Sequence, residues 1–189
     1  MLDLAAHRSN SLTAVARNSR NLPAANLEVL PDAAKLAFRG RPSAIQAAGE
    51  AFGIQLPQTA CRFGVKGNRA AYWLGPDEWL LHATGERPSE PFALLAKALV
   101  GHSYSLVDVS HRSDAFALSG ELSGYVLNHG CPLDLSQQSF PIGMCTRTIL
   151  YKATILLSRP RTDTFHIDVW RSFAPYVWQL LDEARSELA

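Results

Sequence analysis

The sequence predicts an α+β protein made of two ferredoxin-like halves, each with the element order β-α-β-β-α-β. The first observation behind this prediction is periodicity, because strand-like and helix-like apolar patterns alternate in the same order twice. The second is a modest internal repeat, in which FRG at 38–40 corresponds to LSG at 118–120 and PFALLAKAL at 91–99 to FAPYVWQLL at 173–181. A duplication of this kind forms two antiparallel sheets, each covered on one face by two helices.

The first half is expected at about residues 33–110. Its helices are marked by serines at positions suited to an N-cap, Ser43 and Ser89, and by a glycine after each end. GPDE at 75–78 is a turn-forming sequence between two apolar runs, which predicts a hairpin. In chain order, the predicted elements are a strand at 35–39, a helix at 43–52, strands at 69–74 and 78–83, a helix at 89–100 and a strand at 104–110.

The second half is expected at about residues 111–189, with Gly130 ending its first helix and Ser172 capping its last. In chain order, its predicted elements are a strand at 115–120, a short helix at 121–129, strand regions at 145–158 and 165–170, and a helix at 172–188. Residues 1–32 are polar and weakly apolar, so we expect a partly mobile N-terminal segment outside both halves. A partner that orders this segment and a fraying terminus without function are both open.

Composition excludes several classes of protein. The chain has 18 Lys and Arg against 17 Asp and Glu, and a net charge of +1 gives no field that would collect nucleic acid. Cys61, Cys131 and Cys145 are an odd number without a Cys-x-x-Cys spacing, which argues against a disulfide framework and a zinc site. The N-terminus lacks the apolar run of a signal peptide. We therefore expect a cytoplasmic protein with reduced thiols and no membrane partner.

Asp108, Ser110 and His111 are the three residue types of a hydrolytic triad and stand within four positions. Side chains alternate along a strand, so Asp108 and Ser110 point to one face and His111 to the other. A triad needs a serine–histidine hydrogen bond of about 2.6 to 3.2 Å, which strand neighbours cannot make. Ser110 also lacks the glycines of a G-x-S-x-G turn. We predict that these residues satisfy backbone groups at a turn, with hydrolysis as the minor alternative.

Three arginines stand beside apolar sequence in or after predicted strands, where each guanidinium must find a carboxylate or a partner surface. They are Arg112, Arg147 and Arg171. The candidate acids inside the chain are Asp108, Asp134 and Asp168. Internal ion pairs and a subunit interface are both open, and we favour the internal network. The histidines form no i, i+4 or H-x-H pair that would indicate a metal site.

Several motifs in register resemble the sarcosine oxidase gamma subunit family. They are GPDEWLL at 75–81, DVSHR at 108–112, GCPLDL at 130–135, FPIGMCTRT at 140–148 and DVWRSFAPYVWQLL at 168–181. The resemblance covers about residues 33–187, so it implies one gamma-like domain over 33–189. It also implies a fold similar to the N-terminal domain of the aminomethyltransferase-like, folate-binding proteins.

The resemblance implies a role in a complex of four subunits. That complex oxidatively demethylates sarcosine to glycine, makes hydrogen peroxide and passes the one-carbon unit to tetrahydrofolate, giving 5,10-methylenetetrahydrofolate. Its FAD, FMN, NAD and tetrahydrofolate sites lie on the alpha and beta subunits and its zinc site on delta, while gamma has no known cofactor or catalytic residue. We therefore expect a non-catalytic chain that docks on alpha, with alpha, beta and delta as its partners.

The alternative function is that of a small, autonomous folate-binding one-carbon transferase. The folate-binding relatives are about twice as long and carry a T-G-Y-T-G-E type motif, which is absent from this sequence. A G-x-G-x-x-G after a strand is absent as well. We accordingly assign no catalytic, cofactor-binding or metal-binding residue. The candidates for a structural or interface role are Asp108, His111, Arg112, Asp134, Arg147, Asp168 and Arg171.

Overall fold

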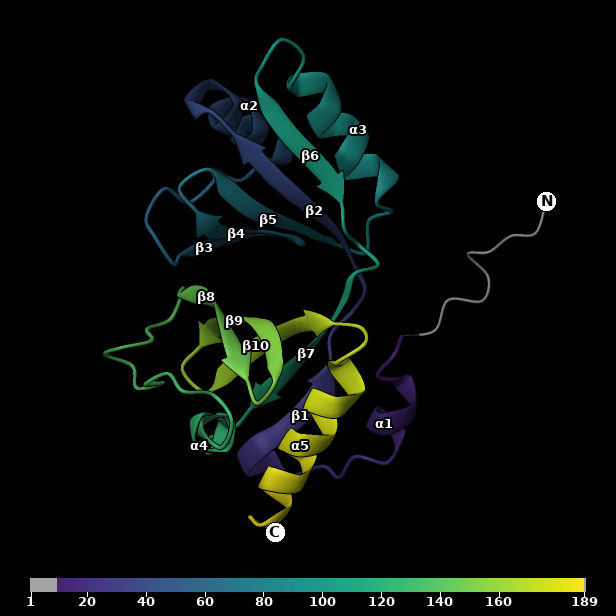
Figure 1. The fold of residues 1–189 in the computed structure, drawn as a ribbon, viewed down its shortest axis with the longest axis vertical. Coiled ribbons are helices and arrows are strands. Elements are labelled where there is room, and N and C mark those ends of the chain that lie inside the picture. The colour runs from purple at the N-terminus through teal and green to yellow at the C-terminus, as the bar shows by residue number, and fades with distance from the viewer. Residues whose placement is uncertain (1–9, 189) are drawn as a thin grey trace, which may run out of the picture.

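Two five-stranded antiparallel sheets form the inner layers of the molecule in the computed structural model, which describes residues 10–188. Helices α2 (Pro42–Phe52) and α3 (Ser89–Ala98) cover the outer face of the first sheet (Figure 1). Helices α4 (Ser123–Asn128) and α5 (Ala174–Ser186) cover the outer face of the second sheet. This arrangement confirms the predicted α+β class and the two halves.

The first sheet has the strand order β3-β4-β5-β2-β6. Its strands are β2 (Ala33–Gly40), β3 (Phe63–Lys66), β4 (Arg69–Gly75), β5 (Glu78–Thr84) and β6 (Tyr104–Asp108). Strands β2, β4, β5 and β6 with the two helices make the predicted β-α-β-β-α-β unit, and β4 and β5 form the predicted hairpin. Strand β3 is an additional edge strand that the sequence pattern did not indicate.

The second sheet has the order β1-β7-β10-β9-β8 and takes one strand from the start of the chain. Its strands are β1 (Asn26–Val29), β7 (Ser113–Ser119), β8 (Cys145–Leu150), β9 (Ala153–Arg161) and β10 (Thr164–Trp170). Strand β1 pairs with β7. The predicted strand region at 145–158 is two strands, because the chain turns at Tyr151, whose φ of 52° is left-handed.

The N-terminal part of the described chain belongs to the second half, which corrects the prediction that residues 1–32 lie outside both halves. Helix α1 (Thr13–Arg17) and a 3₁₀ turn, η2 (Pro23–Ala25), precede β1. Leu12 is fully buried in the second core. The buried guanidinium of Arg185 on α5 donates to the carbonyl of Ala25 at 2.9 Å, which ties this segment to the last helix. The mobility predicted for residues 1–9 lies outside the described residues.

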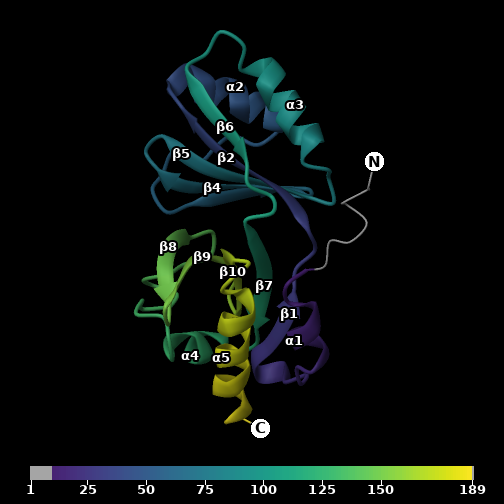
Figure 2. The same cartoon turned by 45° about the vertical axis from the view of Figure 1, so that its right-hand side comes forward.

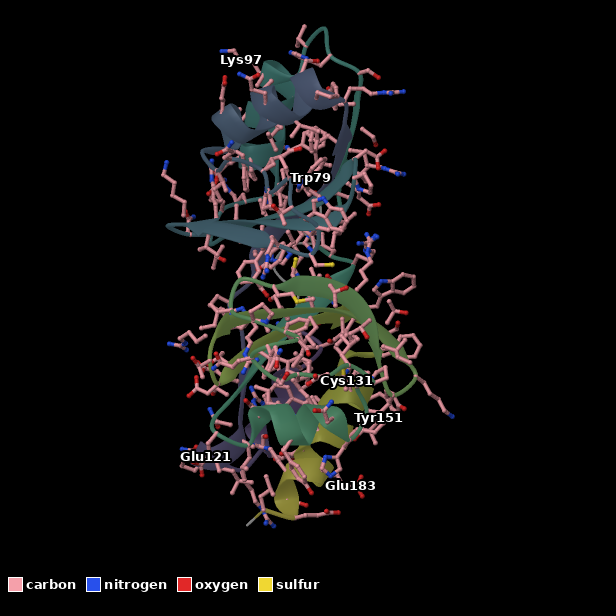
Figure 3. All side chains as sticks on the ribbon, turned by 90° about the vertical axis from the view of Figure 1, so that its left-hand side faces the viewer. Trp79, Lys97, Glu121, Cys131, Tyr151 and Glu183 are labelled. Carbon is pink, nitrogen blue, oxygen red and sulfur yellow. The ribbon has the colours of Figure 1, made fainter. Side chains whose placement is uncertain are left out.

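Alternation along the strands builds each core. Ala34, Leu36 and Phe38 on β2 point to the helices, and Lys35 points to the opposite face. Trp79 on β5 is fully buried between the first sheet and its helices (Figure 3), with its ring centroid 6.0 Å from that of Phe38. A smaller cluster joins the inner faces of the two sheets. It contains Ala70, Tyr72, Leu80, Cys145 and Leu156.

The predicted serine caps are wrong, whereas one predicted helix stop is confirmed. Arg41, Pro88 and Phe173 occupy the N-cap positions, and none makes a side-chain capping bond. Pro42 begins α2 instead, because its fixed φ suits the first helical position. Gly53 ends α2 as predicted, with a left-handed φ of 78°. In the part of the chain described here, no helix is both long and apolar enough to cross a membrane.

Candidate functional site at the junction of the halves

Lys35 is a buried cation at the junction of the two sheets. Its Nζ donates to Asp168 Oδ2 at 2.6 Å, to the Ser113 carbonyl at 3.0 Å and to Ser113 Oγ at 3.1 Å. An ammonium group has three donors, and all three have acceptors here. The contacts tie β2 of the first half to β7 and β10 of the second, so this residue holds the halves in register.

His82 lies beside Lys35 on the neighbouring strand β5. Its Nε2 is 3.8 Å from Asp168 Oδ2, and none of residues 10–188 hydrogen-bonds to it. Burial lowers the pKa of His82 to about 4, and it outweighs the opposite effect of the Asp168 carboxylate. The imidazole is therefore neutral near pH 7, and the 3.8 Å approach is not an ion pair there.

A small cavity of about 30 Å³ adjoins this cluster, and Tyr72, His82, Ser158, His166 and Asp168 are among its lining residues. A volume of this size holds about one or two water molecules. The Tyr72 ring packs 4.9 Å from the His82 ring, and burial raises the pKa of the Tyr72 hydroxyl. Both side chains stay uncharged at neutral pH, and the Lys35–Asp168 pair supplies the charges of the cluster.

Arg147 makes a second link between the halves. Its guanidinium on β8 pairs with the carboxylate of Glu78 at the start of β5. The Arg147 side chain is 46% exposed, so this link lies at the rim of the junction. On the other flank, Arg171 Nε approaches Asp114 Oδ2 at 3.4 Å, and Asp114 also accepts a hydrogen bond from the Ser11 amide at 3.1 Å.

The segment Asp108–Ser110 forms a hydrogen-bonded turn. Asp108 Oδ1 accepts the Ser110 amide at 2.9 Å and the Ser110 hydroxyl at 2.5 Å. Ser110 Oγ accepts the Lys35 amide at 2.9 Å. In a hydrolytic triad the serine hydroxyl donates to an imidazole, whereas here it donates to a carboxylate in the same turn. This geometry satisfies the backbone of β2 at the point where β6 ends.

The remaining predicted residues lie in turns. Asp134 accepts the Ser136 amide at 2.9 Å and the Ser139 hydroxyl at 2.6 Å, which closes an exposed loop after α4 and lowers the pKa of Asp134. His111 and Arg112 lie in the turn between β6 and β7. The Arg112 carbonyl accepts the Arg171 amide at 3.1 Å.

Sequence reasoning selected Asp168 but not the residues that meet it. It also overlooked Glu78 and Asp114 as partners of Arg147 and Arg171. The one available signal was Lys35, a charged residue between buried neighbours, whose position on a strand requires a partner on the opposite face. That signal could have identified Lys35 as a buried cation, but nothing near it in the sequence indicates that Asp168 is its partner.

A cleft of about 290 Å³ lies beside these contacts, at the boundary of the halves. Its lining includes Lys35, Asp114 and Arg171, and it also reaches the turn after β6 through Ser110 and His111. Charges of both signs line it, and several of them are used in the pairs described above. Among the described residues, no group of three or more His, Cys, Asp or Glu side chains could hold a metal ion. The contacts at this junction bind the two halves together.

The fold defines the class of protein. The glycine cleavage system aminomethyltransferase T from Bartonella henselae superposes on this chain with a TM-score of 0.65 at 16% identity, covering 87% of this chain and 46% of that one. This likeness shows the fold alone. The chain therefore has the duplicated α+β architecture found in part of an aminomethyltransferase.

The chain belongs to the sarcosine oxidase gamma subunit family, whose sequence profile matches residues 32–187. It is 33% identical over 144 residues to the sarcosine oxidase subunit gamma of Corynebacterium sp. (strain P-1), covering 76% of this chain and 70% of that one. It also matches a chain of the heterotetrameric sarcosine oxidase from Corynebacterium sp. U-96, solved in complex with pyrrole 2-carboxylate. That match has a TM-score of 0.87 at 26% identity and covers 95% of both chains.

Proposed function

We propose that this chain is the non-catalytic gamma subunit of a heterotetrameric sarcosine oxidase. The observation that carries the proposal is the match over 95% of both chains to a chain of such a heterotetramer. In this assembly, sarcosine is oxidatively demethylated to glycine, with formation of hydrogen peroxide and of 5,10-methylenetetrahydrofolate. The chain supports the assembly by docking on the aminomethyltransferase-like region of the alpha subunit, and beta and delta complete the complex.

The junction supports a structural role. The cation Lys35 is neutralised and fully hydrogen-bonded, and the hydroxyl of Ser110 is held by Asp108. Burial keeps His82 neutral, and its Nε2 has no hydrogen-bond partner among the described residues. A general base works best with a pKa near the working pH, and burial moves the pKa of His82 well below that range. FAD, FMN, NAD, tetrahydrofolate and zinc accordingly belong to the other subunits in this proposal.

A cytoplasmic location is part of the proposal. Cys61, Cys131 and Cys145 are all free thiols, and the last two are buried. Burial raises the pKa of the Cys145 thiol to about 12, so it stays protonated and packs as a small apolar group. Free thiols in this number are typical of a reducing compartment.

Co-purification tests the proposed function. The chain would be co-expressed with tagged alpha and with beta and delta, and the purified complex would be weighed by native mass spectrometry. One copy of this chain per alpha subunit is the expected result. Calorimetric titration of the purified chain with tetrahydrofolate tests the folate-binding alternative, because saturable micromolar binding by the chain alone would favour a transferase and contradict the proposal.

A further inference from the structure

Strand β6 is an open edge of the first sheet. Within residues 10–188, it is the last strand in the order and pairs only with β2 (Figures 1 and 2). The Val109 amide bonds to the Lys35 carbonyl at 2.8 Å, so the odd-numbered residues of this segment bond toward β2. Hydrogen bonding alternates along an antiparallel strand, and therefore the backbone groups of Tyr104, Leu106 and Asp108 point to the free edge.

Among the described residues, this edge has little of the usual protection against pairing with another chain, because its one charged side chain, Asp108, is held by Ser110 in the following turn. Natural edge strands are protected by charged side chains, especially lysine, by proline, by bulges or by a covering element. Strand β6 has the sequence YSLVD, with neither lysine nor proline, and four of its five residues are exposed. The opposite edge of the same sheet differs, because β3 ends in Lys66 and its Phe63 amide bonds to the Gly143 carbonyl.

Exposed apolar side chains border the same open side of the junction. Val107 points to the inner face of the first sheet, since it pairs with Ala37, two positions beyond Lys35. On the second sheet, Ile149 and Trp170 follow Arg147 and Asp168 by two positions, so they share the inner face. Val107 and Ile149 are 50% exposed and Trp170 is 55% exposed, although each is on a face that the other sheet covers elsewhere.

The contacts between the sheets place Ile149 and Trp170 on the β6 side. Cys145, at the start of β8, packs under β4, where its Sγ is 3.7 Å from the Trp73 carbonyl. The inner face of the second sheet then reaches Glu78 on β5 through Arg147 and Lys35 on β2 through Asp168. Ile149 and Trp170 lie two residues farther along the same strands than Arg147 and Asp168, so they lie beyond β5 and β2, on the side of β6. Val107, Ile149 and Trp170, which we call the β6 ledge, therefore face one opening.

The beginning of β6 carries an excess of positive charge. A hollow of about 380 Å³ lies beside Tyr104 and is lined by Arg39, Arg41 and Asp77. Arg39 pairs with Asp77 at 3.1 Å, so the charge of Arg41 remains in excess within the hollow. An arginine at such a position suits a carboxylate, to which it can donate two parallel hydrogen bonds.

We propose that β6 receives an extended segment of a neighbouring subunit as an additional strand. Its main chain bonds to Tyr104, Leu106 and Asp108, its apolar side chains cover the β6 ledge, and an acidic residue reaches Arg41. This is the strand-addition mode of peptide recognition. The inference rests on the proposed function, in which the partner is a different subunit. A second copy of this chain is the alternative occupant, and the tests below separate it from a different subunit.

Substitution at the two edges of the sheet tests the inference. Val107→Arg introduces a charge on β6, and Val65→Arg is the matched control, because Val65 is 62% exposed on the opposite edge strand β3. In co-expression with tagged alpha and with beta and delta, Val107→Arg should lower the amount of this chain that co-purifies with alpha by about tenfold or more. A charge in the centre of an apolar contact is expected to have an effect of this size. Val65→Arg should assemble like the wild type.

The isolated full chain provides the control for folding. If Val107→Arg lowers its melting temperature, Trp170→Ala replaces it in the test, because Trp170 is exposed and lies on the other sheet. Hydrogen exchange gives a second readout, in which the amides of Tyr104, Leu106 and Asp108 should gain protection in the assembled complex. Normal assembly of both variants, or equal loss with Val65→Arg, would overturn the inference.

Other outcomes separate this inference from the proposed function. If the wild-type chain fails to join the complex, the proposed function fails and the inference falls with it. If the wild type assembles while the three β6 amides exchange as fast as in the isolated chain, only the inference fails. A homodimer of the isolated chain that Val107→Arg dissociates, with assembly unaffected, would assign β6 to a second copy and contradict the partner proposed here.

Discussion

Replacing Lys35 by Met removes the cation that joins the halves and leaves Asp168 without its main partner. Met has a similar length and no charge, so the change removes three hydrogen bonds without creating a large cavity. Breaking a buried ion pair by removing one partner costs about 3 to 5 kcal/mol. The Lys35 and Asp168 side chains are only 5% and 13% exposed, so this range applies to the pair.

The assay is urea unfolding of the isolated chain, followed by tryptophan fluorescence. Thermal unfolding is a second readout, because for a chain of about 190 residues a loss of 3 to 5 kcal/mol lowers the melting temperature by roughly 6 to 20 °C. The double variant Lys35→Met with Asp168→Asn is the control, because it removes the uncompensated charge as well and should be less destabilised than the single change predicts. A loss below about 1 kcal/mol for Lys35→Met would show that the Lys35–Asp168 pair behaves like an exposed ion pair and does not hold the halves together.

Three further predictions concern the junction. Arg147→Met should cost the isolated chain no more than about 1 kcal/mol in urea unfolding, because its pair with Glu78 is half exposed, and a loss of about 3 to 5 kcal/mol would mean that the pair behaves as buried. Ser110→Ala should cost about 1 kcal/mol of stability, because one hydrogen bond in the turn is lost. Oxidase turnover of the complex should stay within about threefold, because no proton transfer depends on Ser110. A thousandfold drop in turnover of an intact complex would instead support a catalytic triad. The folded chain binds a proton at His82 only near pH 4, whereas the unfolded chain binds it near pH 6.5. The contribution of neutral His82 to the free energy of unfolding is therefore fully present above about pH 6.5. It falls by on the order of 3 kcal/mol as the pH is lowered toward 4. Unfolding curves of His82→Gln should show a shallower acid dependence, and an unchanged slope would contradict the assignment.

The fold was predictable where local patterns are long. The helices after β2 and β5, and the hairpin of β4 and β5, follow from apolar periodicity, from Gly53 and from the GPDE turn. Strands β1 and β3 have four residues each, too few for an alternating pattern to stand out from a loop. The turn at Tyr151 has no glycine, proline or asparagine to mark it, so two strands were predicted as one region.

The site was less predictable because its contacts are long-range. Lys35 and Asp168 are 133 positions apart, and only the pairing of two separate sheets brings them together. Asp108 and Ser110 are close in sequence, and their turn could be derived from strand alternation and turn chemistry. The position of the N-terminal segment on the second half depends on Leu12 and Arg185, whose burial no local pattern reveals.

The structural role of this chain is tested most directly by comparing the oxidase purified from cells that express alpha, beta and delta with and without it. Without the chain, we expect the yield and thermal stability of the complex to fall. The turnover of sarcosine per bound flavin should stay within about threefold, a change of less than about 1 kcal/mol in the barrier. A complex that forms in full yield without the chain would contradict the structural role. A stable complex that loses its turnover in the chain's absence would contradict the claim that the chain is non-catalytic.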